Sequence, residues 1–255
     1  MAEAGALRFE RYPTGTGDEW MLAHGPDSGA RILILGPLLN EMNLMRAFTV
    51  DIARRLAGRG YACAIPDLPG CGESLRPLRD VRWEEWPAAA AAAAEAWRAA
   101  DGSPPHIVSL RGGCLLDGAG EAASRWRFSP ARGGALIRPL ERAQRIAGRE
   151  AGRADDREEG VVPLAGYSFA PAFLDGLRTV EPVGAAGPPL RTVEAERAGV
   201  PLWRRAEPGT DAELSARLSD DIAQWVSSCG RGPASPARAR PSARPMTTAN
   251  APSVC

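Results

Sequence analysis

The chain has 255 residues, enough for one sizeable hydrophobic core or two small ones. Hydrophobic residues make up 44% of it and charged residues 24%, which excludes a wholly disordered or fibrous protein. The 31 basic and 31 acidic residues cancel, so we expect no nucleic-acid partner held by bulk charge. Because every basic residue is arginine, mechanisms that need a lysine, such as a Schiff base, are excluded as well.

No stretch approaches the roughly 18 consecutive apolar residues that a membrane-spanning helix needs. The first five residues lack the basic start of a signal peptide. We therefore expect a cytoplasmic protein without a transmembrane segment. The five cysteines show no CxxC spacing, which favours neither a disulfide scaffold nor a zinc site, and the sequence indicates no metal and no cofactor.

Short β-rich runs alternate with helical stretches in the first half of the chain. The strand predicted at 31–35 is apolar throughout after Arg31, which is typical of a strand buried on both faces. The alternation gives a β-α-β-α-β order, which implies a mostly parallel sheet with right-handed crossovers. Strands are predicted at 7–12, 19–23, 31–35, 61–66 and 106–110, and helices at 44–59, at 83–100 and directly after Gly112-Gly113.

The second half continues the α/β pattern and ends in a segment of different composition. Asp211 is expected to begin a closing amphipathic helix, and residues 130–160 to form a reduced lid. Residues 230–255, rich in proline, alanine and arginine, bury too little surface to fold, so we predict one domain over 1–229 and a disordered tail over 230–255. The remaining strands are predicted at 126–128, 161–165, 190–195 and 201–206, and the helices at 140–149 and 171–177.

Three loops carry motifs in a fixed order. Asp67-x-x-Gly70-x-Gly72-x-Ser74 follows one predicted strand, Gly36-Pro37 follows the strand before it, and Ser109-Leu110-Arg111-Gly112-Gly113 follows the strand after it. In this order the segments resemble the glycine loop, the oxyanion loop and the nucleophile elbow of α/β-hydrolases, and residues 201–225 resemble the last strand and helix of that fold. The resemblance implies an α/β-hydrolase-like fold, with a mostly parallel sheet flanked by helices.

The elbow departs from the hydrolase pattern at its central residue. In G-x-S-x-G the serine is the nucleophile, but Arg111 stands at that position, and arginine stays protonated with no lone pair to attack an acyl group. The base is missing too, because the two histidines, His24 and His106, precede the elbow and none follows the last strand. Two of the three members of a Ser-His-acid triad are therefore absent, and no residue is assigned as catalytic.

Further segments narrow the resemblance. Residues 40–46, 67–74, 110–112 and 165–171 resemble α/β-hydrolase-like proteins associated with exosortase gene clusters, which serve PEP-CTERM protein sorting and exopolysaccharide production in bacteria. This resemblance implies that the ligand or partner belongs to an exosortase or polysaccharide system.

The candidate ligand-binding residues are expected at the carboxyl edge of the sheet, where ligands of open α/β sheets bind. Arg111 would present a planar cation suited to a carboxylate or phosphate, and Glu41 would pair with it or act as a base. Alternatively, Glu41 and Arg111 are an ion pair that fills a vacated site, Asn43 only caps the following helix, and Ser74 only caps the start of the next segment. The candidate set is Glu41, Asn43, Arg46, Ser74, Arg111 and Gly112.

Two functional hypotheses remain. The favoured one is a pseudo-hydrolase that binds a small anionic molecule or a partner protein in the former active-site crevice. The alternative is an active hydrolase that acts on an ester or acyl substrate by a mechanism without the usual triad. Cys71 and Cys114 are weak alternative nucleophiles: no histidine is placed to lower the pKa of Cys71, and Cys114, three residues past Arg111, is expected to face the core.

Overall fold

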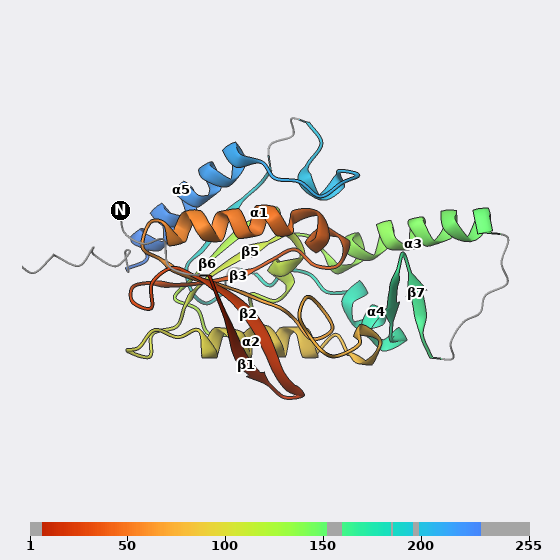
Figure 1. The fold of residues 1–255 in the computed structure, drawn as a ribbon, viewed down its shortest axis with the longest axis horizontal. Coiled ribbons are helices and arrows are strands. Elements are labelled where there is room, and N and C mark those ends of the chain that lie inside the picture. Colours follow the sequence, from red (N-terminus) through yellow and green to blue (C-terminus); the bar gives the residue numbers. More distant parts are fainter. Residues whose placement is uncertain (1–6, 152–159, 185, 196–198, 231–255) are drawn as a thin grey trace, which may run out of the picture.

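The computed structural model describes residues 7–151, 160–184, 186–195 and 199–230 (Figure 1). Its centre is a seven-stranded sheet in the order β1-β2-β4-β3-β5-β6-β9. Only β2 among these strands runs against its neighbours, so the sheet is mostly parallel, as predicted. The strands are β1 (Arg8–Thr14), β2 (Gly17–His24), β3 (Arg31–Leu35), β4 (Ala62–Pro66), β5 (His106–Leu110), β6 (Ser124–Phe128) and β9 (Leu190–Val193).

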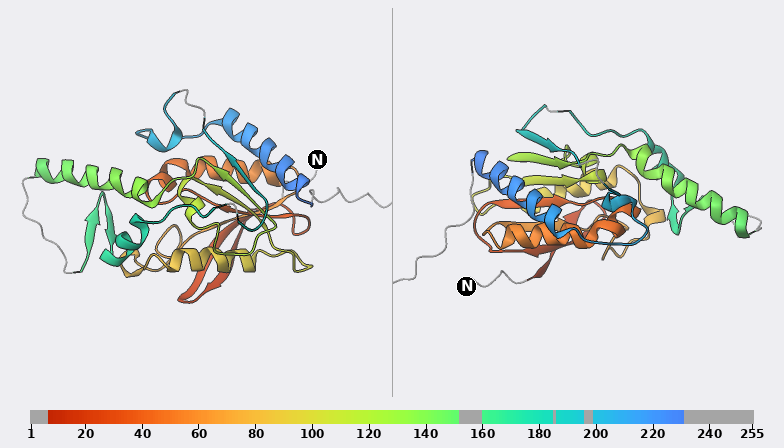
Figure 2. Two further views of the ribbon diagram at one scale, coloured as in Figure 1. Left: turned by 180° about the vertical axis from the view of Figure 1, so that it is seen from behind. Right: turned by 90° about the horizontal axis from the view of Figure 1, so that it is seen from above.

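Helices cover both faces of the sheet and produce two hydrophobic cores. Helices α1 (Asn40–Ala57) and α5 (Ala212–Ser228) lie side by side on one face, and α2 (Glu85–Ala96) lies on the other (Figures 1 and 2). Successive side chains of a strand point to opposite faces. In β3, Leu33 and Leu35 therefore join the core under α2, whereas Ile32 and Ile34 join the core under α1 and α5.

An insertion between β6 and β9 forms the lid region. It contains α3 (Gly133–Ala151), a two-stranded antiparallel sheet of β7 (Val162–Leu164) and β8 (Tyr167–Phe169), and α4 (Pro171–Arg178). The far end of α3 projects beyond the body of the molecule (Figures 1 and 2). The insertion extends past the predicted limits of 130–160, and Phe169, Phe173 and Leu177 anchor it in the main core.

The structure differs from the predicted elements at several points. The helix predicted at 140–149 is α3, which begins at Gly133. The first helix begins at Asn40 rather than at residue 44, and the turn after β5 continues as a 3₁₀ helix, η2 (Arg111–Leu115), rather than an α-helix. Residues 167–169 form a strand that the sequence did not predict. Residues 201–206 contain no strand: they contain the 3₁₀ helix η3 (Leu202–Arg204), and Pro201, which has no N–H to donate, precedes it. A further short 3₁₀ helix is η1 (Leu78–Asp80).

Residues 231–255, nearly all of the predicted tail, lie outside the described residues. Among the described helices, none combines the length and the apolar character required to cross a membrane.

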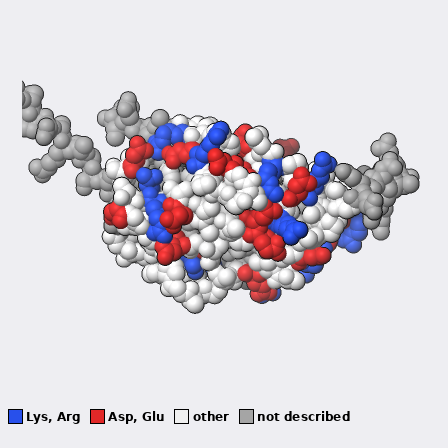
Figure 3. Space-filling model, turned by 90° about the horizontal axis from the view of Figure 1, so that it is seen from below, with Lys and Arg blue, Asp and Glu red and all other residues white. Residues whose placement is uncertain are grey.

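On the face that carries α2, seen in Figure 3, positively and negatively charged side chains are interspersed and form no large patch of one sign.

Candidate functional site

The turn after β5 has the backbone geometry of a strained elbow. Arg111 follows the strand directly and has φ 55°, a conformation that L-residues seldom adopt outside functional turns. Gly113 lies so close to the preceding loop that an added Cβ would come within 2.2 Å of the Leu35 carbonyl oxygen. At Gly112, a Cβ would come within 2.8 Å of Leu136 of α3. The two glycines therefore allow the elbow to pack against both the sheet and the lid.

The Arg111 guanidinium is held by three different elements. Its Nε and Nη2 donate to the two carboxylate oxygens of Glu41, at 3.1 and 3.0 Å. Its Nη1 donates to the Ser129 carbonyl oxygen at 2.7 Å, and the Trp203 ring stacks against it with its centroid 4.0 Å from Cζ. The Arg111 side chain is only 13% exposed and that of Glu41 14%. The structure thus places the two as a bidentate ion pair at the elbow.

Burial and hydrogen bonding act in opposite directions on Glu41. Burial raises the pKa of its carboxyl, while the hydrogen bonds and charge of Arg111 and the charge of Arg204 lower it, and the net pKa is raised. Both carboxylate oxygens accept from Arg111, whose positive charge stabilises the ionised carboxylate, so Glu41 is a weaker base than an unpaired carboxylate at the same position would be. Beside the pair lies a pocket of about 140 Å³, lined by Leu38, Pro139 and Trp203 among others.

Two other predicted residues, Arg46 and Asn43, bind partners other than Arg111 and Glu41. The Arg46 Nη1 donates to the Asp67 carboxylate across a long 3.4 Å, and the Asn43 amide donates to the Tyr167 hydroxyl at 3.0 Å. Asn43 lies inside α1, whose N-cap position is taken by Leu39, so the prediction that Asn43 caps this helix is wrong. Of the predicted set, Glu41 and Arg111 thus line the pocket beside the elbow, whereas Arg46 lines a different pocket, and the two pockets have Leu38 in common.

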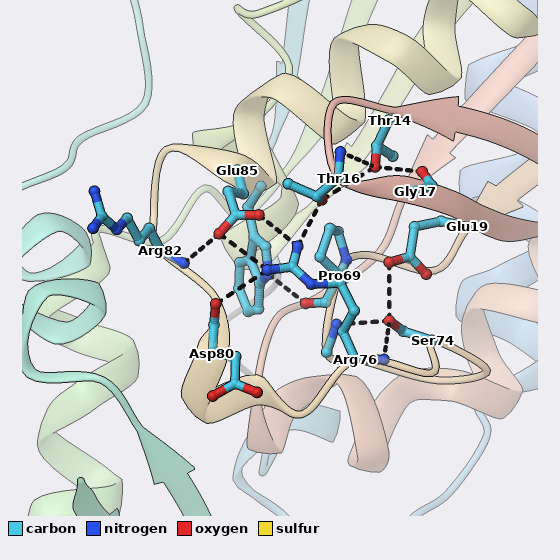
Figure 4. A network of polar contacts seen from close by, with 12 residues as sticks. Thr14, Thr16, Gly17, Glu19, Pro69, Ser74, Arg76, Asp80, Arg82 and Glu85 are labelled. Atoms are coloured by element: carbon cyan, nitrogen blue, oxygen red, sulfur yellow. Dashed lines mark hydrogen bonds and ion pairs between the residues drawn. The ribbon is translucent and has the colours of Figure 1, made fainter. Parts of the chain in front are cut away.

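Ser74 belongs to a third group, shown in Figure 4. Its hydroxyl donates to Glu19 at 2.9 Å and accepts from the backbone N–H groups of Gly70 and Arg76. These bonds tie the glycine loop to β2, and Arg76 extends the network by pairing with Glu85 of α2. Ser74 therefore holds the loop in place, and neither a helix cap nor a contact with Arg111 is formed.

The alternative catalytic groups lie in unsuitable surroundings. His106 is the first residue of β5, and His24 pairs with Cys63 near the start of β4, so both histidines lie at the amino edge of the parallel strands. The elbow lies at the carboxyl edge. Burial raises the pKa of the Cys71 and Cys114 thiols to about 12 each, so neither is a thiolate at neutral pH.

Sequence reasoning missed a charged cluster beneath the elbow. The Arg127 guanidinium binds Asp117 through two hydrogen bonds of 2.7 Å, and the Ser109 hydroxyl donates to the same carboxylate at 2.7 Å. Asp117 and Ser109 are fully buried. Hydrophobic periodicity gave no signal for this cluster, because a buried arginine in β6 breaks the apolar pattern. Ser129 and Trp203, which hold Arg111, were missed as well.

Solved structures with the same arrangement of strands and helices are α/β-hydrolases. A candidate aryl esterase from Burkholderia cenocepacia is 16% identical, with a TM-score of 0.56, over 87% of this chain and 99% of that one. A thermophilic esterase from Thermogutta terrifontis is 14% identical, with a TM-score of 0.54, over 87% of this chain and 99% of that one. The thioesterase domain of a curacin biosynthetic pathway is 13% identical, with a TM-score of 0.51, over 86% of this chain and 100% of that one.

These likenesses concern the fold. No protein-family model matches the sequence, and no curated protein matches it significantly. The chain therefore has an α/β-hydrolase fold, as its loop motifs predicted, and an elbow whose central residue is an arginine in an ion pair.

Proposed function

We propose that this chain is a pseudo-hydrolase: an α/β-hydrolase fold without hydrolytic chemistry that binds a small anionic molecule or a partner at the carboxyl edge of its sheet. The observation that carries the proposal is the Arg111–Glu41 pair. It occupies the elbow with a group that cannot attack an acyl carbon, and it engages the nearest carboxylate at the same time.

The positions of the histidines support this proposal. A triad needs a base within hydrogen-bond reach of its nucleophile. The chain has two histidines in all, and both lie at the edge of the sheet opposite the elbow. A nucleophile in the crevice would therefore have to be activated by some other group.

The alternative is a hydrolase that acts on an ester or acyl substrate without the usual triad. Glu41 is the base that such a mechanism would use, since its pKa is raised by burial. We favour the pseudo-hydrolase over this alternative because Glu41 is bound to Arg111 through both of its oxygens. The hydrolysis and adduct assays described below distinguish the two hypotheses.

The proposal extends to the biological setting of the ligand or partner. The motifs at residues 40–46, 67–74, 110–112 and 165–171 resemble the exosortase-associated subgroup, and this resemblance supports a ligand or partner from an exosortase or polysaccharide system. Co-purification from a bacterium with such a system tests this part. Recovery of its proteins with the wild-type chain, and their loss after crevice substitutions, is the expected result.

Two assays on the purified chain test whether it lacks hydrolytic activity and a reactive nucleophile. The first measures hydrolysis of a panel of short and long acyl esters and thioesters, and the second measures the intact mass after treatment with a fluorophosphonate. We expect turnover no higher than that of Arg111→Ala and no covalent adduct, on protein shown by circular dichroism to be folded. Arg132→Ala, which removes a surface arginine that pairs with Glu181, is the matched control. Turnover of the wild type and of Arg132→Ala well above that of Arg111→Ala, or an adduct on one residue, would establish the alternative.

A further inference from the structure

A second pocket, separate from the one beside Arg111 and Glu41, is lined mostly by apolar side chains. It encloses about 50 Å³ between the 36–39 loop, the first turns of α1 and the end of β4. Aliphatic side chains form most of its wall, including Met42, Ile65 and Leu116. Ile65 is only partly buried although Ala64 and Pro66 on either side of it are buried, and Met42 is partly buried as well, so the wall of this pocket includes apolar surface left open within the fold.

Two charged groups line this pocket. Asp67 is largely buried, and its carboxylate also accepts the Glu73 backbone N–H at 3.1 Å. Arg46 is 44% exposed and reaches Asp67 only through one long contact of 3.4 Å. Within the described part of the chain Arg46 has no other polar partner, so most of its five N–H groups remain available to a ligand.

A polar contact joins α1 to β8 of the insertion, one residue beyond Met42. Asn43 follows Met42 in the chain and donates to the Tyr167 hydroxyl, which leaves the phenolic proton free to donate elsewhere. Burial, followed by the nearby Cys71, raises the pKa of Tyr167, so the hydroxyl keeps its proton at neutral pH. Cys71 also lines the apolar pocket, whereas Tyr167 and Asn43 lie outside its lining.

We propose that this pocket binds a short aliphatic carboxylate, with the alkyl chain among Met42, Ile65 and Leu116 and the carboxylate on Arg46. The inference rests on the proposed binding role of the carboxyl edge and gives that role a ligand class. It also moves the anion from Arg111, whose guanidinium is already held by Glu41, Ser129 and Trp203, to Arg46.

The volume of the pocket limits the length of the chain. A cavity of roughly 150 Å³ accommodates benzene, so by proportion about 50 Å³ takes two or three carbon atoms beyond the carboxylate. Each buried methylene increases affinity about fourfold until the pocket is full. Affinity is thus expected to rise from acetate through propionate to butyrate and then to stop rising.

Ligand-observed NMR titrations of the full chain with acetate, propionate, butyrate, pentanoate and hexanoate test this profile. Butanol and butylamine serve as the neutral and cationic probes, and both are expected to bind at least about tenfold more weakly than butyrate. Arg46→Gln is expected to weaken butyrate binding at least about tenfold. Arg132→Gln is the matched control, because Arg132 also makes a surface ion pair of 3.4 Å, with Glu181, and we expect it to leave butyrate binding unchanged.

A second variant tests the pocket without touching a charge. Met42→Ala enlarges the apolar end, so the chain length at which affinity stops rising is expected to increase by one or two carbons. Three results would overturn the proposal: no binding of any carboxylate at concentrations on the order of 10 mM, equal affinity at every chain length, or an unchanged length limit in folded Met42→Ala. None of them affects the adduct and turnover assays at the elbow, so failure of this inference is distinguishable from failure of the pseudo-hydrolase proposal.

Discussion

Arg111 and Glu41 depend on each other because neither charge is well solvated. Removing one partner of a buried ion pair leaves the other charge uncompensated, which costs more than the pair itself contributes. We expect Arg111→Ala to lower the free energy of unfolding by on the order of 3 kcal/mol at neutral pH. The double variant Arg111→Ala/Glu41→Leu is expected to recover part of this loss, because it leaves no orphan carboxylate. Urea denaturation of both variants measures the effect.

The pH dependence of this cost has a definite sign. Burial already holds the pKa of Glu41 above its usual range, and loss of Arg111 raises it further. A carboxyl whose pKa is raised in the folded state destabilises the fold at pH values above that pKa. This destabilisation disappears when the carboxyl is protonated. The cost of Arg111→Ala should therefore shrink as the pH falls towards the pKa of Glu41. An equal loss in Arg132→Ala, or a cost that does not change with pH, would contradict this account.

His24 makes the stability of the folded chain depend on pH with the opposite sign, because it stabilises the fold at high rather than low pH. It is buried, and burial followed by the charges of Arg54 and Arg8 lowers its pKa below the usual value of about 6.5. The unfolded chain thus binds a proton more readily than the folded chain does. The stability that neutral His24 contributes is present above about pH 6.5, and it is lost as the pH falls through the lowered pKa.

We therefore expect the free energy of unfolding of the wild-type chain, relative to His24→Leu, to decrease on acidification from about pH 6.5. Comparison with the variant is needed because Glu41 titrates with the opposite sign. Denaturant titrations of both proteins at several pH values measure the difference. If the two curves stay parallel between pH 7 and 5, His24 does not titrate as the structure implies.

At the scale of elements, the elbow depends on the close approach of two backbone segments. Gly113 leaves no room for a side chain, because an added Cβ would overlap the carbonyl oxygens of Leu35 and Gly36. Backbone atoms cannot move aside as a flexible side chain would. We expect Gly113→Ala to cost on the order of 4 kcal/mol, which places it among the most damaging single substitutions. The midpoint of thermal unfolding measures this loss.

The control for Gly113 is a glycine with open space around it. Gly148 lies in α3 and has no heavy atom within 4 Å of an added Cβ. Alanine there should stabilise the chain slightly, by up to about 1 kcal/mol, because it favours the helix. If the two alanine variants unfold at similar temperatures, the tight packing of the elbow is not what constrains residue 113.

The sequence predicted some elements closely and others not at all. The strands at 31–35 and 106–110 were predicted with the ends they have in the structure, because central parallel strands form short apolar runs bounded by loops. Asp211 accepts the Leu214 N–H at 3.0 Å, as expected of an N-cap. The start of α1 was missed because Leu39, with φ 56° and no capping side chain, gives no such signal.

Only the part of the candidate site whose position follows from the strand order was predictable from the sequence. Glu41 and Arg111 are far apart in the chain, but both follow neighbouring parallel strands and so meet at one edge of the sheet. The partners that fix Arg111 are a backbone carbonyl and a ring from segments whose course depends on the whole chain. No periodicity encodes such contacts, and for the same reason nothing in the sequence indicated that Ser74 binds Glu19.

At the scale of the whole molecule, the sheet itself separates the elbow from both histidines. Strand β5 begins at His106 and ends just before Arg111, so its five residues hold the two about 16 Å apart. His24 lies at the same edge as His106. Restoring a nucleophile at the elbow should therefore be insufficient to restore chemistry, because no imidazole reaches it.

The separation of the elbow from the histidines predicts the outcome of rebuilding the site in two steps. Arg111→Ser alone should form no fluorophosphonate adduct above the level of Arg111→Ala. Trp203 stacks on the far end of the Arg111 side chain, 4.0 Å from Cζ, and a serine hydroxyl would lie several bonds nearer the backbone, so a histidine at residue 203 would not be placed to activate it. We therefore expect Arg111→Ser/Trp203→His to form no more adduct than Arg111→Ser. Intact mass measured over time compares these variants. An adduct with Arg111→Ser alone would show that another group acts as the base, and that the fold lost only its nucleophile.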